Sequence, residues 1–390
     1  MKNKKITIAG VPFSDNLGDY AIYYSLMNML ENNNKDITPL DLAGRRDFHK
    51  KKITSGFSLK QKIISSQNAV LNWFFTFGNA VYVSMRKNNE NNVIIKSSDY
   101  VLIGGGNLLS DNYGNFPIKL WFLYRLIKKH NVNYSIVSVG VGNNWSWLAK
   151  LIFTKITRDA EKVSVRDTNS KMLLEKFTGR KDIEIICDPA IMMSSILQQY
   201  NKKSKQGTIG INVVDWGSLF FSSDLNTKEK YLNFNYNDFY KCIALYYISL
   251  GYNVAFFTNG ADEDNKYLVE LKKYLKEFDN KNVSFHIIED FTSLVDTITS
   301  CEKIISSRLH SIIIASSYSI PTVGLVWDNK VRSFYNVLSC GDNYIELDEL
   351  VIADSDGLLI KIDSMFPTNT VLSQRINMLK IELEKFISNY

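Results

Sequence analysis

Short runs of β-branched and other apolar residues alternate with amphipathic stretches along the whole 390-residue chain. This alternation is typical of parallel sheets whose strands are joined by helical crossovers. We expect strands at 5–10, 37–42, 100–103, 134–139, 163–166 and 183–187, and again at 208–213, 253–257, 283–287, 303–305 and 322–325. The pattern therefore predicts an α/β protein with two Rossmann-like domains that face each other across a cleft.

Helical periodicity fills the intervals between these strands. We expect helices near 19–31, 59–85, 116–130, 146–159, 168–177, 236–250, 262–278, 308–318 and 330–338. The polar stretch 201–207 has the composition of an exposed linker. We therefore divide the chain into an N-terminal domain at 1–200, a C-terminal domain at 207–367 and a closing helix at 368–390.

Charge and cysteine content narrow the function classes. A formal net charge of +6 is small for a dedicated nucleic-acid binder but suits a protein that handles anions. The cysteines lie far apart with no CxxC pair, which predicts reduced thiols, no disulfide framework and no metal site. No apolar run reaches the roughly 18 residues of a membrane span, and the first residues do not form a signal peptide. We expect a cytoplasmic protein.

Ligands of such folds bind where strands end at their carboxyl edges, so these segments are the first places to search. The first strand leads through Asn16, Leu17 and Gly18 to Asp19, the single acidic group at the start of the next helix. Asp19 either charges the first helical turn or acts as a general base on a substrate hydroxyl.

Two further strand ends carry candidate residues of the first domain. Gly104, Gly105, Gly106 and Asn107 follow the strand at 100–103, and glycines there allow close approach to a ligand or simply a tight crossover. Neither this segment nor Gly140-Val141-Gly142 completes a dinucleotide fingerprint, and no phosphate-binding P-loop motif is present. Arg166 ends another strand and is either an anion clamp or part of a surface pair with Asp167. Asp188, in a later Cys-Asp-Pro turn, is more typical of a turn residue.

The segment Ser306 to Ala315 is the most informative in the second domain. Arg308 and His310 fall in the first turn of an apolar helix, where positive charge is unfavourable unless an anion is bound. His310 could instead be a satisfied core histidine. Lys330 follows the next strand and could reach the same pocket.

At these residues the chain resembles the polysaccharide pyruvyl transferase family. The likeness rests on Asn16-Leu17-Gly18-Asp19, on Gly104 to Asn107, on Ser164 to Asp167 with Cys187-Asp188-Pro189, and on Ser307 to His310 with Pro321 and Asp328 to Val331. Trp327 stands where we expect Tyr. The resemblance implies a GT-B-like arrangement and transfer of the enolpyruvyl unit of phosphoenolpyruvate onto sugar hydroxyls of a cell-surface glycan, with no further cofactor.

The resemblance also implies roles for residues. Phosphoenolpyruvate would bind at Arg308, Leu309 and His310, with Arg166 and Lys330 as additional cations. We expect His310 and Asp19 to be the catalytic residues, and we place Asn16, Gly105, Gly106 and Asn107 among the substrate-binding residues. Adding a hydroxyl across the double bond needs one proton delivered and one removed, which a cationic helix start facing an aspartate could do.

Two other functions fit the same pattern. A glycosyltransferase that uses a nucleotide sugar would also place cations at a helix start, and a glycan-binding module could keep the fold without turnover. A thermal shift with phosphoenolpyruvate against nucleotide sugars tests the glycosyltransferase, and phosphate release from phosphoenolpyruvate with an acceptor tests the binding module.

Residues 44–62 hold seven lysines and arginines and one acid, Asp47, and an aromatic stretch follows at 73–77. This combination indicates either peripheral contact with a membrane that holds a lipid-linked oligosaccharide acceptor, or a solvated loop beside core aromatics.

Overall fold

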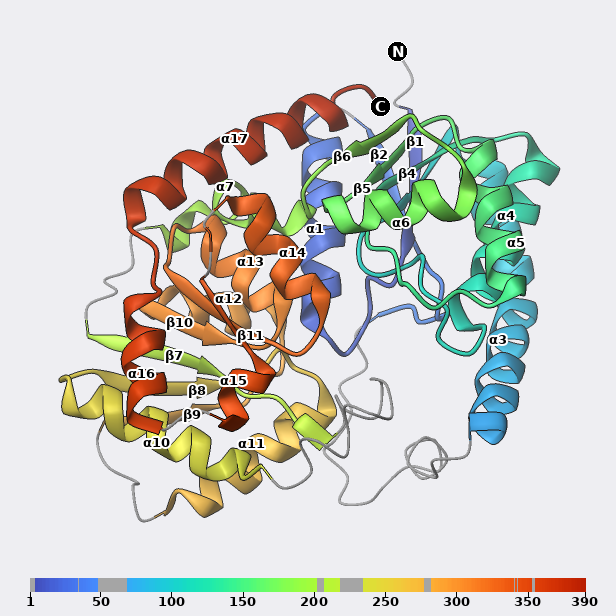
Figure 1. Cartoon of the computed structure of the whole chain (residues 1–390). Coiled ribbons are helices and arrows are strands. Elements are labelled where there is room, and N and C mark those ends of the chain that lie inside the picture. The colour runs from blue at the N-terminus through green and yellow to red at the C-terminus, as the bar shows by residue number, and fades with distance from the viewer. Residues whose placement is uncertain are drawn as a thin grey trace.

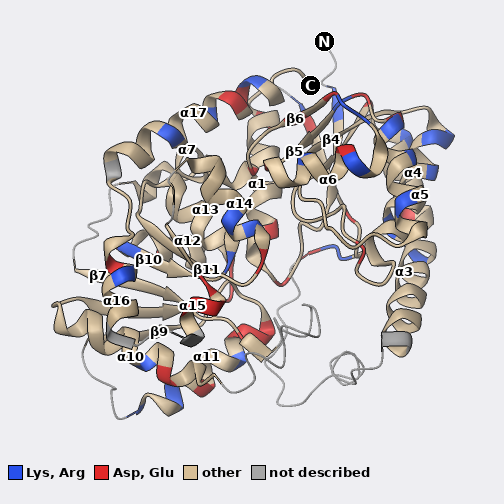
Figure 2. Ribbon diagram, in the orientation of Figure 1, with Lys and Arg blue, Asp and Glu red and all other residues tan. Residues whose placement is uncertain are grey.

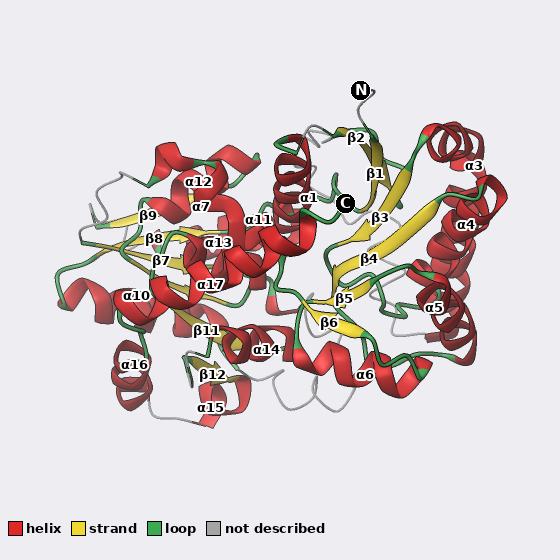
Figure 3. Ribbon diagram, turned by 90° about the horizontal axis from the view of Figure 1, so that it is seen from above, coloured by secondary structure: helices red, strands yellow, loops and turns green. Residues whose placement is uncertain are grey.

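The computed structural model describes residues 4–33, 35–47, 69–201, 207–217, 234–276, 282–339, 341, 343–352 and 355–390. These residues form two parallel six-stranded sheets with helices packed on their faces (Figure 1, Figure 3). The α/β class and the two Rossmann-like sheets predicted from the sequence are confirmed.

The first sheet has the strand order β2-β1-β3-β4-β5-β6, and all its pairs are parallel. This order reverses between β1 and β3, as in flavodoxin-like folds. Its strands are β1 (Lys5–Gly10), β2 (Asp36–Asp41), β3 (Tyr100–Gly104), β4 (Asn133–Val139), β5 (Val163–Val165) and β6 (Ile183–Ile185).

Helices between and after these strands begin mostly at side chains that can accept a hydrogen bond from the first helical turn, including Asn16, Ser146 and Asp167. They are α1 (Leu17–Glu31), α3 (Ala69–Ser97), α4 (Asn115–His130), α5 (Trp147–Asp159), α6 (Thr168–Thr178), η1 (Pro189–Met192), α7 (Met193–Ile196) and η2 (Gln198–Tyr200).

The second sheet has the order β12-β11-β10-β7-β8-β9, again all parallel. Its order reverses between β7 and β10, which is the arrangement of dinucleotide-binding Rossmann domains. Its strands are β7 (Thr208–Asn212), β8 (Asn253–Phe257), β9 (Val283–His286), β10 (Lys303–Ser306), β11 (Thr322–Val326) and β12 (Tyr344–Glu346).

The helices of this second half are α10 (Tyr236–Ser249), α11 (Asp262–Tyr274), α12 (Phe291–Thr299), α13 (Leu309–Ser317), α14 (Asn329–Leu338), α15 (Leu347–Ile352), α16 (Ser355–Ser364) and α17 (Asn369–Ile387). Every residue of α13 is buried, which agrees with a sequence that is apolar around much of the helix. None of the helices formed by the described residues combines the length and hydropathy needed to cross a bilayer.

One apolar core joins the two halves. It contains residues of β1 and α1 from the first half, residues of β10 and α13 from the second, and the inner face of α17. A backbone hydrogen bond from the N–H of Leu17 to the carbonyl of Asn259 crosses the same boundary at 3.1 Å. Figure 1 shows α17 running from the second sheet back to the first, where Lys4 Nζ donates to the carbonyl of Tyr390 at 2.9 Å. The bond from Leu17 to Asn259 thus lies beyond the carboxyl ends of β1 and β8, and α17 joins the second half to the amino end of β1.

Several elements differ from the sequence-based expectations. Strand β12 and helices α15 and α16 were not predicted, because their short segments carry too little periodicity. Helix α3 extends to Ser97, past the expected end at 85. The predicted linker at 202–206, the basic stretch from residue 48 onward and the first ten residues of the helix expected at 59–85 lie outside the described residues.

Candidate active site

Three segments identified at strand ends meet where the two sheets face each other. The N-terminus of α1 and the loop after β3 lie at the reversal point of the first sheet, and the N-terminus of α13 lies at the reversal point of the second. Ligands bind at such points in open parallel sheets. The candidate active site is therefore the place where these segments of both sheets meet.

Helix α1 approaches α13 so closely that only glycine fits at position 18. A Cβ on Gly18 would lie 2.2 Å from Nδ1 of His310 and 2.4 Å from its Cβ. The side chain of Asn16 caps α1, because its Oδ1 accepts a hydrogen bond from the N–H of Gly18 at 3.1 Å. In this structure Asn16 therefore shapes the turn that brings Gly18 and Asp19 to His310.

His310 faces a carboxylate from the first domain. Its Nε2 lies 3.6 Å from Oδ2 of Asp188, in the turn before η1, and both atoms are buried without a hydrogen-bond partner among the described residues. Burial raises the pKa of Asp188, but the neighbouring His310 and Arg166 outweigh it and hold that pKa below its ordinary value. Asp188 is thus a carboxylate placed to support positive charge on His310.

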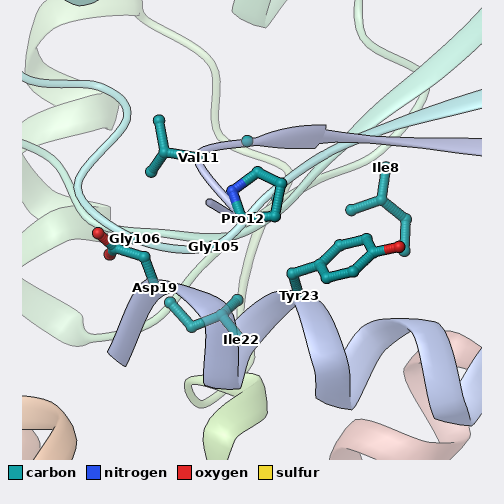
Figure 4. A pocket seen from close by; sticks show the side chains of 10 residues that line it. Ile8, Val11, Pro12, Asp19, Ile22, Tyr23, Gly105 and Gly106 are labelled. Carbon is teal, nitrogen blue, oxygen red and sulfur yellow. The ribbon is translucent and has the colours of Figure 1, made fainter. Parts of the chain in front are cut away.

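Asp19 lies within the electrostatic reach of His310, in the lining of a small pocket formed with Val11, Pro12 and the glycine loop. Figure 4 shows its side chain directed from α1 towards Gly106, and a Cβ on Gly106 would lie 3.5 Å from Oδ1 of Asp19. Burial raises the pKa of Asp19, while the charge of His310 and a hydrogen bond from Ser14 oppose this shift. A raised pKa makes a carboxylate a stronger base.

The loop after β3 owes its path to two glycines. Gly105 and Gly106 have φ of +76° and +66°, and a Cβ on Gly105 would lie 2.0 Å from Cγ2 of Ile22. Larger residues are excluded at Gly105 because α1 passes directly beneath the loop. The loop thus presents exposed Asn107 at the edge where Asp19 lies.

Gly140 follows β4, and its lack of a side chain lets Asn107 and Arg166 pack directly against the backbone there. A Cβ on Gly140 would lie 2.6 Å from Oδ1 of Asn107 and 2.7 Å from Nη2 of Arg166. Arg166 is buried, and its Nε lies 3.4 Å from Oδ2 of Asp167. The glycines at 140–142 were considered only as a nucleotide motif, so this packing role was missed.

Arg308 is held by a carboxylate that no local sequence pattern predicts. Its Nε and Nη2 donate to Asp264 of α11 at 2.9 and 2.8 Å, and its Nη1 has no partner in the part of the chain that the structure describes. Burial raises the pKa of Asp264 to about 6, against the opposing charge of Arg308. The guanidinium is thus fixed in orientation, with one nitrogen left to bind a ligand.

Leu309 and Lys330 lie at the starts of two different helices, α13 and α14. The Leu309 side chain is buried in the core, so its backbone N–H is the group that can reach a ligand. Lys330 Nζ lies 3.3 Å from Oδ2 of Asp328 and 4.3 Å from the centre of the Trp327 ring. Trp327 is itself fixed by a hydrogen bond from Nε1 to the carbonyl of Ser307 at 2.9 Å.

Three cations from two domains influence one another at this edge. Burial lowers the pKa of Lys330; Asp328 opposes the shift, and the positive charges of Arg166 and Arg308 add to it. Such mutual repulsion marks a site suited to an anion with more than one negative charge. Among the described residues, no group of three His, Cys, Asp or Glu side chains could hold a metal ion.

The family model for polysaccharide pyruvyl transferases matches residues 16–329. The chain belongs to this family. The match runs from the cap of α1 to the first residue of α14, and so includes Asp19, Arg166, Asp188, Arg308 and His310. No curated protein matches the chain.

Solved structures share the fold of this polysaccharide pyruvyl transferase family member at low identity. UDP-GlcNAc 2-epimerase from Methanocaldococcus jannaschii is 12% identical over 97% of this chain and 100% of its own, with a TM-score of 0.52. The UDP-GlcNAc 2-epimerase from Neisseria meningitidis is 10% identical over 98% and 100%, with a TM-score of 0.51. The N-terminal domain of Candida albicans trehalose-6-phosphate phosphatase is 10% identical over 100% and 96%, with a TM-score of 0.53. These similarities establish the GT-B-like architecture.

Proposed function

We propose that the chain transfers the pyruvate unit of phosphoenolpyruvate onto sugar hydroxyls of a cell-surface polysaccharide or its precursor, as a ketal. The observation that carries this proposal is the gathering of Arg166, Arg308 and Lys330 from both domains beside His310. Phosphoenolpyruvate carries a phosphate and a carboxylate, and needs such a set of fixed cations. The family match supports the reaction class.

The donor would bind at the N-terminus of α13. Arg308 would use Nη1, while Asp264 keeps the guanidinium in place through Nε and Nη2. The first backbone N–H groups of α13, including that of Leu309, and the positive end of the helix dipole add to the attraction. Lys330 would exchange its Asp328 partner for the donor, and Arg166 would close the site from the first domain.

The acceptor would enter from the first domain, along the glycine loop. Asn107 is exposed there, and the backbone at Gly105 and Gly106 lies beside Asp19. Asp19 would accept the proton of the sugar hydroxyl, and its raised pKa suits that task. Asn16 would act by holding this turn in place.

An addition followed by a displacement accounts for the product. The hydroxyl oxygen bonds to C2 of phosphoenolpyruvate as its proton passes to Asp19, while His310 delivers a proton to the methylene carbon. A second hydroxyl then attacks C2 and the bond to the phosphate oxygen breaks. The proton held by Asp19 passes to the departing phosphate, and the proton of the second hydroxyl restores His310. Inorganic phosphate leaves and the ketal remains, so the transfer needs phosphoenolpyruvate as co-substrate and no other cofactor.

A lipid-linked oligosaccharide is the acceptor form that we favour over a free sugar. Phosphoenolpyruvate is a cytoplasmic metabolite, so the enzyme would meet such an acceptor as a peripheral protein at the inner face of the membrane.

The decisive experiment follows inorganic phosphate release with phosphoenolpyruvate and candidate acceptors, with mass spectrometry for an added pyruvate ketal. Arg308→Gln and Lys330→Gln should each weaken phosphoenolpyruvate binding, by about 1.5–3 kcal/mol per charge-assisted hydrogen bond lost. Arg332→Gln is the matched control, because Arg332 lies on the same helix as Lys330 and pairs instead with Glu346.

Two outcomes would contradict the proposal. Thermal stabilisation by nucleotide sugars but not by phosphoenolpyruvate would indicate a glycosyltransferase. Glycan binding without phosphate release from any acceptor would indicate a non-catalytic binding module.

A further inference from the structure

Helix α3 carries a row of large apolar side chains that face solvent. Phe74, Tyr82 and Met85 are 64%, 61% and 63% exposed, and Leu71 and Val93 continue the row. These five residues are spaced so that all lie on one side of a helix with 3.6 residues per turn. We call them the outer row.

The inner face of α3 joins the core around the first sheet through Ala80 and Ile95, with Phe77 and Val81 partly buried against it. Ala80 and Ser84 are buried on the opposite side of the helix, which packs against α4. A helix at the surface of a soluble domain normally places its large apolar residues inward and its polar residues outward. Helix α3 has apolar residues on both sides in its N-terminal half, so the exposed outer row needs an explanation beyond folding.

The end of α3 that bears the aromatics is exposed in the molecule. Figure 1 shows α3 at the margin of the first domain, with its N-terminal end reaching beyond α4. Trp73 stacks on Phe77 with ring centres 4.9 Å apart and packs edge-on against Phe74 at 5.0 Å. Aromatic side chains gathered in this way are favoured at the headgroup level of a bilayer.

Charge distribution identifies the kind of surface that fits. Residues 69–85 contain no Lys, Arg, Asp or Glu, and the charged residues of α3 begin at Arg86 (Figure 2). The sequence immediately before the helix, residues 48–68, has five lysines and no acid. In the sequence, a stretch rich in lysine thus leads directly into an uncharged aromatic helix, a combination that is complementary to an anionic lipid surface.

We propose that the outer row of α3 docks this protein on an anionic membrane surface, with α3 lying in the plane of the headgroups. The proposal rests on the proposed function in one respect, since a lipid-linked acceptor would be presented at that surface. It concerns α3, whose outer row belongs to neither the donor nor the acceptor residues.

Co-sedimentation of the full chain with vesicles tests the docking. The wild-type protein should bind vesicles of phosphatidylcholine and phosphatidylglycerol at low salt, and should bind pure phosphatidylcholine vesicles more weakly. Raising the salt to 1 M should weaken binding to the anionic vesicles, because the Debye length falls from about 10 Å at 0.1 M to about 3 Å. Phe74→Ser combined with Tyr82→Ser should reduce binding about tenfold or more, since both rings would otherwise leave water.

A matched control comes from exposed apolar residues elsewhere. Ile360 and Ile381 are 61% and 64% exposed on α16 and α17, so Ile360→Ser with Ile381→Ser removes similarly exposed groups outside α3. This control should bind vesicles like the wild type. Both double variants should keep wild-type thermal stability and wild-type phosphate release with a soluble acceptor, which separates failure of docking from failure of the catalytic proposal.

Three results would overturn the proposal. The wild type could ignore anionic vesicles at low salt, or the α3 variant could bind them as well as the wild type. Alternatively, the wild type could form a dimer that the α3 variant dissociates, without any vesicle binding. That last result would assign the outer row to a second copy of the chain.

Discussion

Asp188 and His310 come from different sheets, and each keeps a buried polar atom unpaired in the described part of the chain. Leaving such a group unsatisfied costs about 1–3 kcal/mol, which folding alone does not favour. The separation of 3.6 Å needs only a small movement to become a charge-assisted hydrogen bond when a ligand closes the site. We interpret Asp188 as the residue that orients His310 and supports its positive charge.

Asp188→Asn tests this role. Removing the carboxylate charge disfavours the protonated imidazole, so a smaller fraction of the enzyme carries the proton that His310 must deliver and kcat should fall. The limb of the pH–rate profile on which the acid loses its proton should shift to lower pH. Asp188→Glu should restore part of the shift, and Asp182→Asn, at an exposed carboxylate beside β6, should leave the profile unchanged. A purely structural role would lower activity equally at every pH.

Asp19→Asn tests the proposed base. Its turnover should fall about 10²–10⁴-fold with little change in phosphoenolpyruvate binding. The base works only when deprotonated, so activity of the wild type should be lost as the pH falls through the pKa of Asp19. This loss of activity should occur at a pH above 3.8, the ordinary pKa of an aspartate, because burial raises the pKa of Asp19. A near-normal rate in Asp19→Asn would reduce the residue to a charge in the first turn of α1.

At the scale of elements, the site is made by the N-termini of α1 and α13 approaching almost to contact. Gly18 is the contact residue, since any Cβ there would overlap the ring and the Cβ of His310. The backbone bond from Leu17 to Asn259 and the cap at Asn16 fix the same approach. Positioning of His310 therefore depends on a residue with no side chain.

Gly18→Ala should separate these two helices. The overlap with His310 cannot be relieved by a flexible side-chain end, so the variant should lose about 1–3 kcal/mol of unfolding free energy, with a large loss of kcat. Denaturant unfolding and phosphate release would measure both effects. Gly357→Ala is the control, because its Cβ on α16 would meet no atom within 4 Å and should gain up to about 1 kcal/mol.

The sequence predicted these elements better than it predicted the contacts between them. Helical period and strand-end position are local properties, so the segments at Asn16, Gly104, Arg166 and Arg308 could be identified from the sequence alone. Arg308 binds Asp264, which lies 44 residues earlier in the sequence, and Arg166 packs against Gly140, which lies 26 residues earlier. Contacts between residues so far apart leave no local pattern in the sequence. Asp188 has the pattern of a turn residue, and it is one, but its second oxygen faces the other domain.

At the scale of the whole molecule, two sheets predicted as separate domains share one continuous apolar core. Residues such as Ile6, Leu26, Ile304 and Ile312 belong to that core together with the inner face of α17. Multidomain chains often unfold in separate steps, but a shared core couples the two halves. The relative position of the two sheets at the candidate site therefore depends on the same core that stabilises the whole fold.

We therefore expect a single calorimetric unfolding transition, and α17 offers a way to test it. Leu383 is fully buried in the shared core, so Leu383→Ala should cost about 2–5 kcal/mol and lower the whole transition. Ile381, two residues earlier on the same helix, is 64% exposed, so Ile381→Ala should change stability by no more than about 0.5 kcal/mol. Two resolved transitions, with only one moved by Leu383→Ala, would show that the halves fold independently and that α17 belongs to just one of them.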